Sequence, residues 1–287
     1  MFASLLLAAA VAAAPASHRR APYVGAISAD AQTGRVLFQD RADAEAYPAS
    51  VTKLMTALLV LEDVEAGRYA LDDRVVATDE AYHSEPSWVG IRAGQSMTVD
   101  DLMMSLLVHS ANDAAIVLGV KSAGSLDAFV RRMNERAQQL GMTRTRYYNP
   151  NGLPPNRAKR YPWTQNNRTT ASDQLKLALE VLKHSEIFKY SSSKVATVTG
   201  GDGKPISMRN SNRILRMDKF HIYNDDGTEA VDGLKTGYID AGGSSIVLTG
   251  KRGTHRVIVV VLGSDGSDTR EAAATRLMTD ALSAVAW

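Results

Sequence analysis

The chain has 287 residues, of which 45% are apolar and 22% are charged, and its formal net charge is +2. This composition is typical of a soluble globular protein, and it excludes a disordered tail, a collagen-like rod and a polytopic membrane protein. The small basic excess argues against a nucleic-acid-binding protein. Because cysteine is absent, disulfides, thiolate metal sites and a cysteine nucleophile are all excluded.

The first residues have the pattern of a secretory signal. An apolar run at 5–13 precedes Ala14-Pro15-Ala16, the A-x-A pattern of a cleavage site, and the run is too short to span a bilayer. We therefore predict a signal peptide over 1–16, an extracytoplasmic protein (periplasmic or secreted), and a single domain over 17–287. A buried N-terminal helix is the alternative.

The order of apolar residues predicts strands at both ends of the chain and helices between them. Strands are expected at 23–30 and 35–39 around a turn with Gly34, and then at 194–199, 233–239, 244–250 and 256–262. Helices are expected at 50–61 from a cap at Ser50, at 102–108 behind a capping box at Thr98, and at 113–120, 125–140, 172–183 (capped by Ser172) and 269–285. This order predicts an α/β (α+β) fold: one antiparallel sheet built from both chain ends, with a helical cluster inserted on one side.

The first of three short motifs is Ser50-Val-Thr-Lys53, an S-x-x-K. Residues three apart on a helix share a face, so a neutral lysine there can take the proton of the serine hydroxyl. Burial and a second nearby cation both lower a lysine pKa, which makes the neutral form attainable. A second copy, Ser191-Ser-Ser-Lys194, lies in a polar stretch before a strand. We favour the first copy because it opens a strongly apolar helix, with a capping serine and a solvated lysine as the alternative.

The second motif, Ser110-Ala-Asn112, lies at the junction of two apolar helical runs. A hydroxyl and an amide presented from a buried turn can relay a proton and orient a substrate amide, whereas two simple helix caps are the alternative. The third motif is Lys235-Thr-Gly237, in which the glycine permits a close approach of the backbone. Its alternative is an edge strand with a solvated lysine.

In this order the three motifs resemble those of the serine β-lactamases and penicillin-binding proteins. The surrounding residues narrow the resemblance to the low-molecular-mass D-alanyl-D-alanine carboxypeptidases, a family of serine peptidases. Those residues are Tyr47-Pro-Ala-Ser50, Ser110-Ala-Asn-Asp113, Asn149-Pro-Asn-Gly-Leu153, Asn210-Ser-Asn212 and Asp232-Gly-Leu-Lys-Thr-Gly237. The resemblance covers residue 23 to the C-terminus and implies the β-lactamase/transpeptidase-like fold.

The resemblance also implies a role for each residue of the first two motifs. Ser50 would be the acylated nucleophile, and Lys53 would be its general base. Ser110 would relay a proton to the leaving group, and Asn112 would hold the substrate amide. No metal or cofactor is expected for this chemistry.

The third motif would bind the substrate. Lys235 would keep Lys53 neutral and attract the substrate carboxylate, which Thr236 would bind beside Gly237. The oxyanion hole would consist of the backbone N–H groups of Ser50 and Tyr238. Arg270 resembles the arginine that helps to hold the terminal carboxylate in the family, and an ordinary helix arginine is its alternative.

Two features depart from the family pattern. Carboxypeptidases often carry a second β-rich domain and a C-terminal amphipathic anchor, and we expect neither here, nor an integral membrane anchor, because the chain ends at Trp287. The stretch 154–168 is longer than usual, basic, and contains Tyr161 and Trp163. Our hypothesis is a rim loop that grips the glycan or an acidic stem peptide, with a solvated loop as the alternative.

The predicted function is removal of the terminal D-alanine from peptidoglycan stem peptides that end in D-Ala-D-Ala, with β-lactams as inhibitors. A class A β-lactamase needs a glutamate after the S-x-N motif, but residues 136–172 contain no Asp or Glu and seven Lys or Arg. We therefore expect β-lactams to inhibit the protein rather than to be consumed. A D,D-endopeptidase that cuts cross-links uses the same residues and remains open. A catalytically silent cell-wall-binding module is less favoured, because all the catalytic side chains are present.

Overall fold

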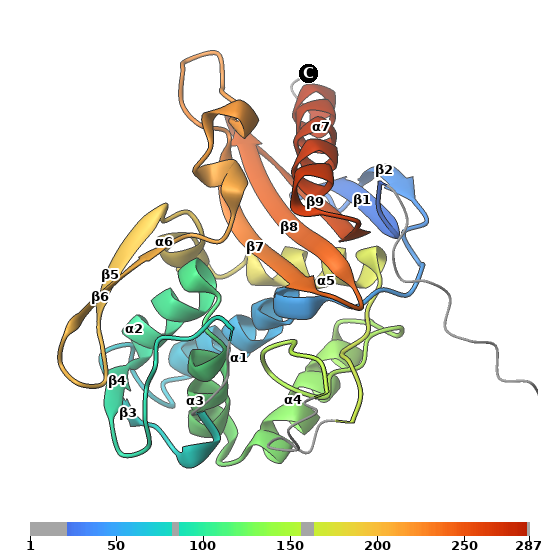
Figure 1. The fold of residues 1–287 in the computed structure, drawn as a ribbon. Coiled ribbons are helices and arrows are strands. Elements are labelled where there is room, and N and C mark those ends of the chain that lie inside the picture. The colour runs from blue at the N-terminus through green and yellow to red at the C-terminus, as the bar shows by residue number, and fades with distance from the viewer. Residues whose placement is uncertain (1–21, 82–85, 156–163, 286–287) are drawn as a thin grey trace, which may run out of the picture.

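The computed structural model describes residues 22–81, 86–155 and 164–285. Its centre is a five-stranded antiparallel sheet in the order β2-β1-β9-β8-β7 (Figure 1). The strands are β1 (Gly25–Asp30), β2 (Val36–Asp40), β7 (Val231–Ile239), β8 (Gly243–Arg252) and β9 (His255–Ser264). Because β1 pairs with β9, the two ends of the chain build one sheet, which confirms the predicted fold class.

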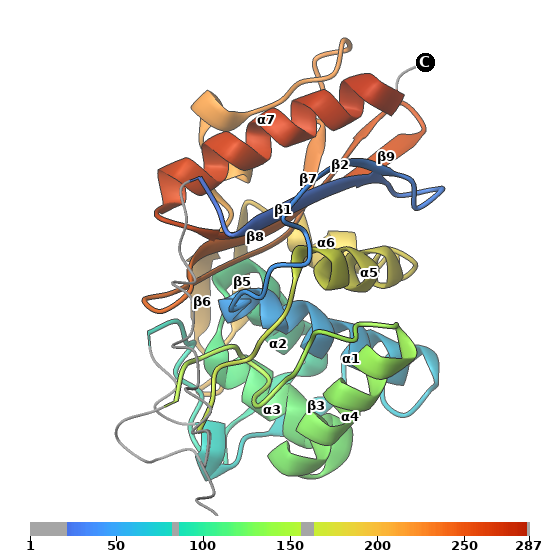
Figure 2. The same cartoon turned by 90° about the vertical axis from the view of Figure 1, so that its right-hand side faces the viewer.

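Helices cover both faces of this sheet. Helix α7 (Ser267–Val285) packs on one face, and the other helices lie against the opposite face (Figure 2). Side chains of β9 alternate between two buried clusters: Val257, Val259 and Val261 face α7, and Ile258, Val260 and Leu262 face the helical cluster. The period of two along a strand explains this division, and burial on both faces explains the nearly continuous apolar run in the sequence.

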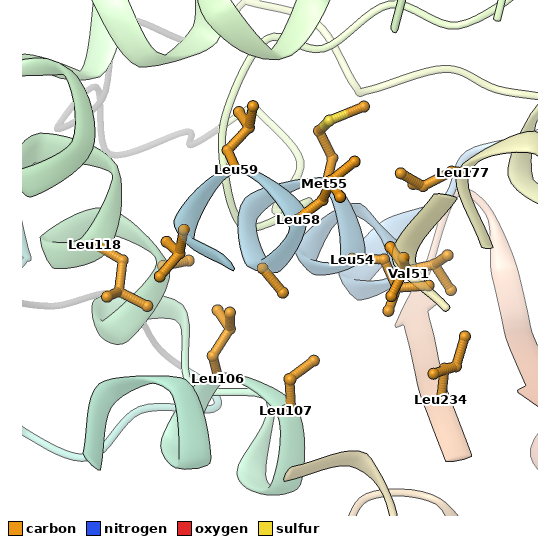
Figure 3. Packing of buried hydrophobic residues seen from close by; sticks show 14 of the residues in the cluster. Val51, Leu54, Met55, Leu58, Leu59, Leu106, Leu107, Leu118, Leu177 and Leu234 are labelled. Carbon is orange, nitrogen blue, oxygen red and sulfur yellow. The ribbon is translucent and has the colours of Figure 1, made fainter. Parts of the chain in front are cut away.

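The helical cluster surrounds one apolar helix, α1. Its elements are η1 (Ala49–Thr52, a 3-10 turn), α1 (Lys53–Glu65), α2 (Val99–Met104), η3 (Ser105–His109, a π-helix), α3 (Asn112–Ala123), α4 (Leu126–Gln139), α5 (Ala171–Val181) and α6 (Ile187–Ser191). Leucines on several sides of α1 meet Leu106, Leu118 and Leu177 from its neighbours (Figure 3). The side chains of the first turn of α1 are therefore shielded from water by these neighbours.

Two small two-stranded sheets, β3-β4 and β5-β6, and three 3-10 turns complete the described part of the fold. They are β3 (Arg74–Val76), β4 (Ser96–Thr98), β5 (Val195–Thr199), β6 (Pro205–Arg209), η2 (Asp79–Ala81), η4 (Arg213–Leu215) and η5 (Asp218–Phe220). Of these, the apolar pattern predicted only β5. The strands β3 and β4 have three residues each, which is too few for a period of two to be recognised.

Some predicted helix starts are confirmed and others are wrong. Thr98 accepts a hydrogen bond from the backbone N–H of Asp101, as a capping residue does. Ser50 is not a cap, since it lies inside the 3-10 turn η1 that precedes α1. Thr170, not Ser172, caps α5, and its hydroxyl accepts from Asp173 N at 3.1 Å. A threonine and a serine two positions apart are both good caps, so the sequence does not distinguish them.

The helix predicted at 102–108 divides into α2 and the π-helix η3, which widens the last turn before the second motif. π-Helical turns within α-helices occur frequently at functional sites. The predicted signal peptide (1–16) and residues 156–163 of the basic stretch, including Tyr161 and Trp163, lie outside the described residues. In the part of the chain that the structure covers, no helix combines the length and the apolar character needed to cross a membrane.

Candidate active site

The structure brings Ser50 and Lys53 of the first motif together at the start of α1. The Lys53 amine donates to Ser50 Oγ, to Asn112 Oδ1 and to the backbone carbonyl of Asn151, each at 2.8 Å. An ammonium group has three N–H donors, so in the charged form each N–H has one of these three oxygens as its acceptor. The amine is thus held within proton-transfer distance of the serine hydroxyl.

The surroundings of Lys53 favour its neutral form. The side chain is fully buried, and burial, followed by the positive charge of Lys235, holds the pKa of the Lys53 amine well below its usual value. The carboxylate of Asp113 acts in the opposite direction. A lysine with a lowered pKa is available as a proton acceptor near neutral pH.

The second motif contacts the first through its asparagine. Asn112 is the first residue of α3, and its side chain does not cap the helix but accepts from Lys53. Ser110 is buried and has a left-handed backbone with φ of 65°, which is uncommon for a residue other than glycine. Its hydroxyl forms no hydrogen bond with another described residue, so the structure does not join Ser110 directly to Lys53 or Lys235.

The third motif lies on the edge strand β7 of the central sheet. Lys235 is almost fully buried, its amine donates to the carbonyl of Thr236 at 2.8 Å, and burial together with the guanidinium of Arg270 lowers the pKa of Lys235 to about 7. The Thr236 hydroxyl is 2.9 Å from the hydroxyl of Ser211. The third motif thus has a titratable amine at Lys235 and, on the next residue, a hydroxyl paired with that of Ser211.

Gly237 brings β7 against the turn that carries the nucleophile. A Cβ atom at Gly237 would lie 2.6 Å from Pro48 O and 2.9 Å from Ser50 N, so only glycine permits this approach. The backbone N–H groups of Ser50 and Tyr238, the predicted oxyanion hole, belong to the two segments that meet here. The side chain of Tyr238 is exposed and donates to Asp240 at 2.7 Å.

Arg270 lies beneath the third motif, at the start of α7. Its side chain is buried, one nitrogen is 2.5 Å from Glu271 Oε1, and another is 3.5 Å from the carbonyl of Ser245. Ser245 is the register partner of Gly237, so the arginine contacts the strand that pairs with the third motif. The pairing with Glu271 is a contact that the sequence analysis missed, because neighbouring Arg and Glu on a helix are usually both solvated.

The second S-x-x-K has a structural role. Ser191 ends α6, and its hydroxyl donates to the carbonyl of Asp232. Lys194 forms an ion pair with Glu229 at 2.5 Å. The two side chains thus serve separate contacts, and the preference for Ser50-Val-Thr-Lys53 agrees with the geometry.

Residues 12–266 match the sequence pattern of the D-alanyl-D-alanine carboxypeptidase family of serine peptidases. The chain belongs to this family. It is 29% identical to a D-alanyl-D-alanine carboxypeptidase of Bacillus subtilis, over 90% of this chain and 61% of that protein. It therefore spans about three fifths of the length of that relative.

Two further comparisons cover most of both chains. A D-alanyl-D-alanine endopeptidase of Pseudomonas aeruginosa is 30% identical over 96% of this chain and 84% of that protein. The crystal structure of a penicillin-binding protein from Listeria monocytogenes with ampicillin bound has a TM-score of 0.74 and 27% identity, covering 91% of this chain and 97% of that one. The structural comparison agrees with the fold that the resemblance implied.

Several residues that support this carboxypeptidase-family site belong to the segments that carry the family resemblance. The sequence does not show which atoms these residues contact. The loop at 149–153 supplies the Asn151 carbonyl to Lys53, and its Gly152 has no room for a Cβ, which would lie 1.9 Å from Ala49 O. Ala49 itself has φ of 50°. Strained backbone next to catalytic groups is common, at roughly 1–3 kcal/mol per residue.

Asp113 is a second such residue. Its buried carboxylate accepts hydrogen bonds from the backbone N–H groups of Val89, Gly90, Ile91 and Ala114. The segment 89–91 is thereby tied to the first turn of α3, next to Asn112. Burial raises the pKa of Asp113 against the effect of these N–H groups.

We expect Gly237→Ala to lower the rate of acylation by a fluorescent penicillin about 100-fold, because displacement of a reacting segment by about 1 Å can have that effect. The new methyl group would meet backbone atoms of residues 48–51, which cannot rotate away. Gly266→Ala is the matched control, since a Cβ there has no atom within 4 Å. Equal rates for the two variants would contradict the close approach.

Proposed function

We propose that this protein is a serine D,D-peptidase that removes the terminal D-alanine from peptidoglycan stem peptides ending in D-Ala-D-Ala. The observation that carries the proposal is the buried Lys53 amine, 2.8 Å from Ser50 Oγ and with a strongly lowered pKa. A solvated lysine at this spacing would be charged and could not accept the serine proton. Membership of the carboxypeptidase family supports the same reaction.

In the proposed acylation step, Ser50 Oγ attacks the carbonyl carbon of the penultimate D-alanine while its proton passes to Lys53. The backbone N–H groups of Ser50 and Tyr238 donate to the oxygen that becomes negative, and Asn112 holds the substrate amide. Ser110 relays a proton to the leaving amine, the amide bond breaks, and D-alanine departs. Water then hydrolyses the ester on Ser50 and restores the serine hydroxyl.

The substrate carboxylate is proposed to bind at the edge strand. The Thr236 hydroxyl and the charged form of Lys235 would hold it, supported by the nearby positive charge of Arg270. Since Arg270 is paired with Glu271, it contributes less than a free guanidinium would. Charge-assisted hydrogen bonds to a carboxylate are about twice as strong as neutral ones.

The pKa of Lys235 leads to a test by pH. Because Lys235 is charged below about pH 7 and neutral above it, we expect the KM for a carboxylate-terminated peptide to rise about tenfold between pH 6 and pH 9. The same peptide with a C-terminal amide should show no such rise. Parallel KM curves for the two peptides would argue against Lys235 as the carboxylate partner.

β-Lactams are proposed to acylate Ser50 and to remain attached. The stretch 136–172 has no carboxylate that could activate a deacylating water in the manner of a class A β-lactamase. Rapid turnover of nitrocefin would contradict this proposal. A protein without catalytic activity would fail to form the covalent adduct at all.

The endopeptidase is the second candidate, because the similarity to the endopeptidase of P. aeruginosa extends over 84% of that protein. Mass spectrometry of purified muropeptides after digestion separates the two reactions. Loss of one terminal D-alanine from pentapeptide monomers identifies a carboxypeptidase. Conversion of cross-linked dimers to monomers identifies an endopeptidase.

The proposed site of action is outside the cytoplasm. The apolar run at 5–13 and the A-x-A pattern that ends at Ala16 support export and cleavage, and the proposed substrate lies in the cell wall. We further propose that residues 17–287 act as one catalytic domain. N-terminal sequencing of the secreted protein tests the position of cleavage.

A further inference from the structure

The strand that carries the third motif changes face partway along its length. In an uninterrupted strand, residues 231 and 237 would share one face of the sheet, because side chains alternate with a period of two. Val231 belongs to the buried cluster of α7, and a Cβ atom on its register partner Gly250 would lie 3.0 Å from Met278 Sδ. A Cβ atom on Gly237 points instead at the turn of Ser50, on the face that the helical cluster covers. The strand β7 therefore turns over between Val231 and Gly237.

One extra residue, Asp232, accounts for this change of face. The register of β7 with β8 shifts between Val231 and Gly233, so that two steps along β7 correspond to one step along β8. Such a β-bulge leaves the extra residue without a partner in the ladder and re-aims the side chains that follow it. Because a shift by one residue moves every later side chain to the other face, the bulge decides whether Lys235 lies toward Lys53 or toward α7.

The side chain of Asp232 is held by an arginine from two strands away. Arg256 of β9 reaches across β8, which lies between β9 and β7 in the sheet (Figure 1). Its guanidinium donates to the two carboxylate oxygens of Asp232 at 2.8 and 2.9 Å and to Thr249 Oγ at 2.8 Å. It also lies over the ring of Phe188 in α6, 4.3 Å from the ring centre. A contact through two parallel hydrogen bonds fixes the direction of the carboxylate as well as its position.

We propose that Asp232 and Arg256 are positioning residues of the active site, whose ion pair holds the β-bulge that turns the third motif toward Ser50. The inference rests on the proposed function, because it assigns the pair a role in that same site. Neither side chain takes part in the proposed reaction. Without the pair, a regular register of β7 on β8 competes with the bulged one, and the regular register carries Lys235 away from Lys53.

The first test removes one charge of the pair at a time. We expect Asp232→Asn and Arg256→Gln each to lower the rate of acylation by fluorescent penicillin about 10- to 100-fold, because a small displacement of a reacting segment has an effect of this size. The double variant should lose no more than the weaker single variant, since the two residues act as a unit. Arg256→Lys keeps the charge but not the planar fork, so its rate should lie between those of Arg256→Gln and the wild type.

A second measurement does not depend on any reaction. Burial and the nearby Arg270 lower the pKa of Lys235 to about 7, so its amine titrates far below the other lysines in NMR spectra of protein with isotope-labelled lysine. Its signal is identified by its absence in Lys235→Met. If the third motif turns away in Asp232→Asn and Arg256→Gln, the amine gains water and its titration should move up by about 1 pH unit or more. An ion pair that only adds stability would leave this titration unchanged.

Arg136→Gln is the matched control. Arg136 is 20% exposed, as Arg256 is, and it pairs with Glu62 and Glu180, which joins three helices and no strand. Its loss should lower the melting temperature about as much as the loss of Arg256, while the acylation rate and the titration of Lys235 stay those of the wild type. If Asp232→Asn and Arg256→Gln behave like this control, the inference is overturned.

The wild type separates this inference from the function on which it rests. If the wild type releases no D-alanine from pentapeptides, the proposed function fails, and the titration of Lys235 still tests the pair. If the wild type releases D-alanine and the two variants match it in both measurements, the inference fails and the function stands. Should Arg256→Gln fail to fold, Asp232→Asn and Arg256→Lys carry the test, and wild-type values in both overturn the inference.

Discussion

Replacement of Ser50 by alanine is expected to abolish covalent labelling by fluorescent penicillin. The variant lacks the hydroxyl that attacks the carbonyl carbon in the proposed acylation step, and in the wild type this hydroxyl lies 2.8 Å from the Lys53 amine. Removal of the nucleophile in a serine peptidase lowers the rate on the order of 10⁶-fold. Labelling on a gel and the mass of the intact protein after incubation with penicillin measure this directly.

Ser191→Ala is the control for that experiment, since Ser191 opens the second S-x-x-K. Its hydroxyl contacts the carbonyl of Asp232, so this variant loses a structural hydrogen bond and should still be labelled. Loss of labelling in Ser191→Ala with retention in Ser50→Ala would reverse the assignment of the nucleophile. Circular dichroism of both variants shows that the fold is kept.

The second large effect is expected from Lys53→Arg. A guanidinium remains protonated at every accessible pH, whereas the surroundings of Lys53 favour a neutral amine. The variant therefore cannot take the proton of Ser50. General-base catalysis contributes about 10²–10⁴-fold. At every pH from 6 to 9, the acylation rate of the variant should therefore be lower than that of the wild type by this factor. The acylation rate constant with fluorescent penicillin is the measured quantity.

Lys194→Arg provides the matched comparison, because an arginine can preserve the ion pair with Glu229. Its acylation rate should equal that of the wild type. A Lys53→Arg variant that is acylated at a normal rate would show that the base is another group. If the acylation rate of Lys53→Arg is low near neutral pH but recovers at high pH, the base is likewise a group other than Lys53.

The sequence was sufficient for the order of the main sheet strands along the chain and for the position of most helices. Strands such as β9 are buried on both faces and read as continuous apolar runs, and α1 reads as an apolar helix. The ordered motifs also predicted that Ser50, Lys53 and Asn112 would meet, although they are up to 62 residues apart. Periodicity is a local signal and needs no knowledge of the packing, whereas the meeting of the motifs was implied by the resemblance to the family.

The remaining features depend on contacts between distant segments. Ala49 and Ser110 have a left-handed backbone, for which alanine and serine carry no preference. At Ala49 this backbone lies directly against Gly152, which is about 100 residues away in the chain. The carboxylate of Asp113 looks like an ordinary first-turn residue of a helix until the segment 89–91 is placed over it. The ion pair of Asp232 with Arg256 likewise requires a strand residue that lies 24 positions later in the chain.

The pairing of β1 with β9 has a consequence for the time at which the site forms. Strand β1 (residues 25–30) can pair with β9 only after residues 257–262 have been made. Contacts between residues so far apart in the sequence slow folding. The nucleophile is made early in synthesis, whereas Lys235 and Arg270 follow it by about 185 and 220 residues. A chain that ends before β7 therefore contains Ser50 but not Lys235 or Arg270, and chemical competence arrives only after these residues have been made.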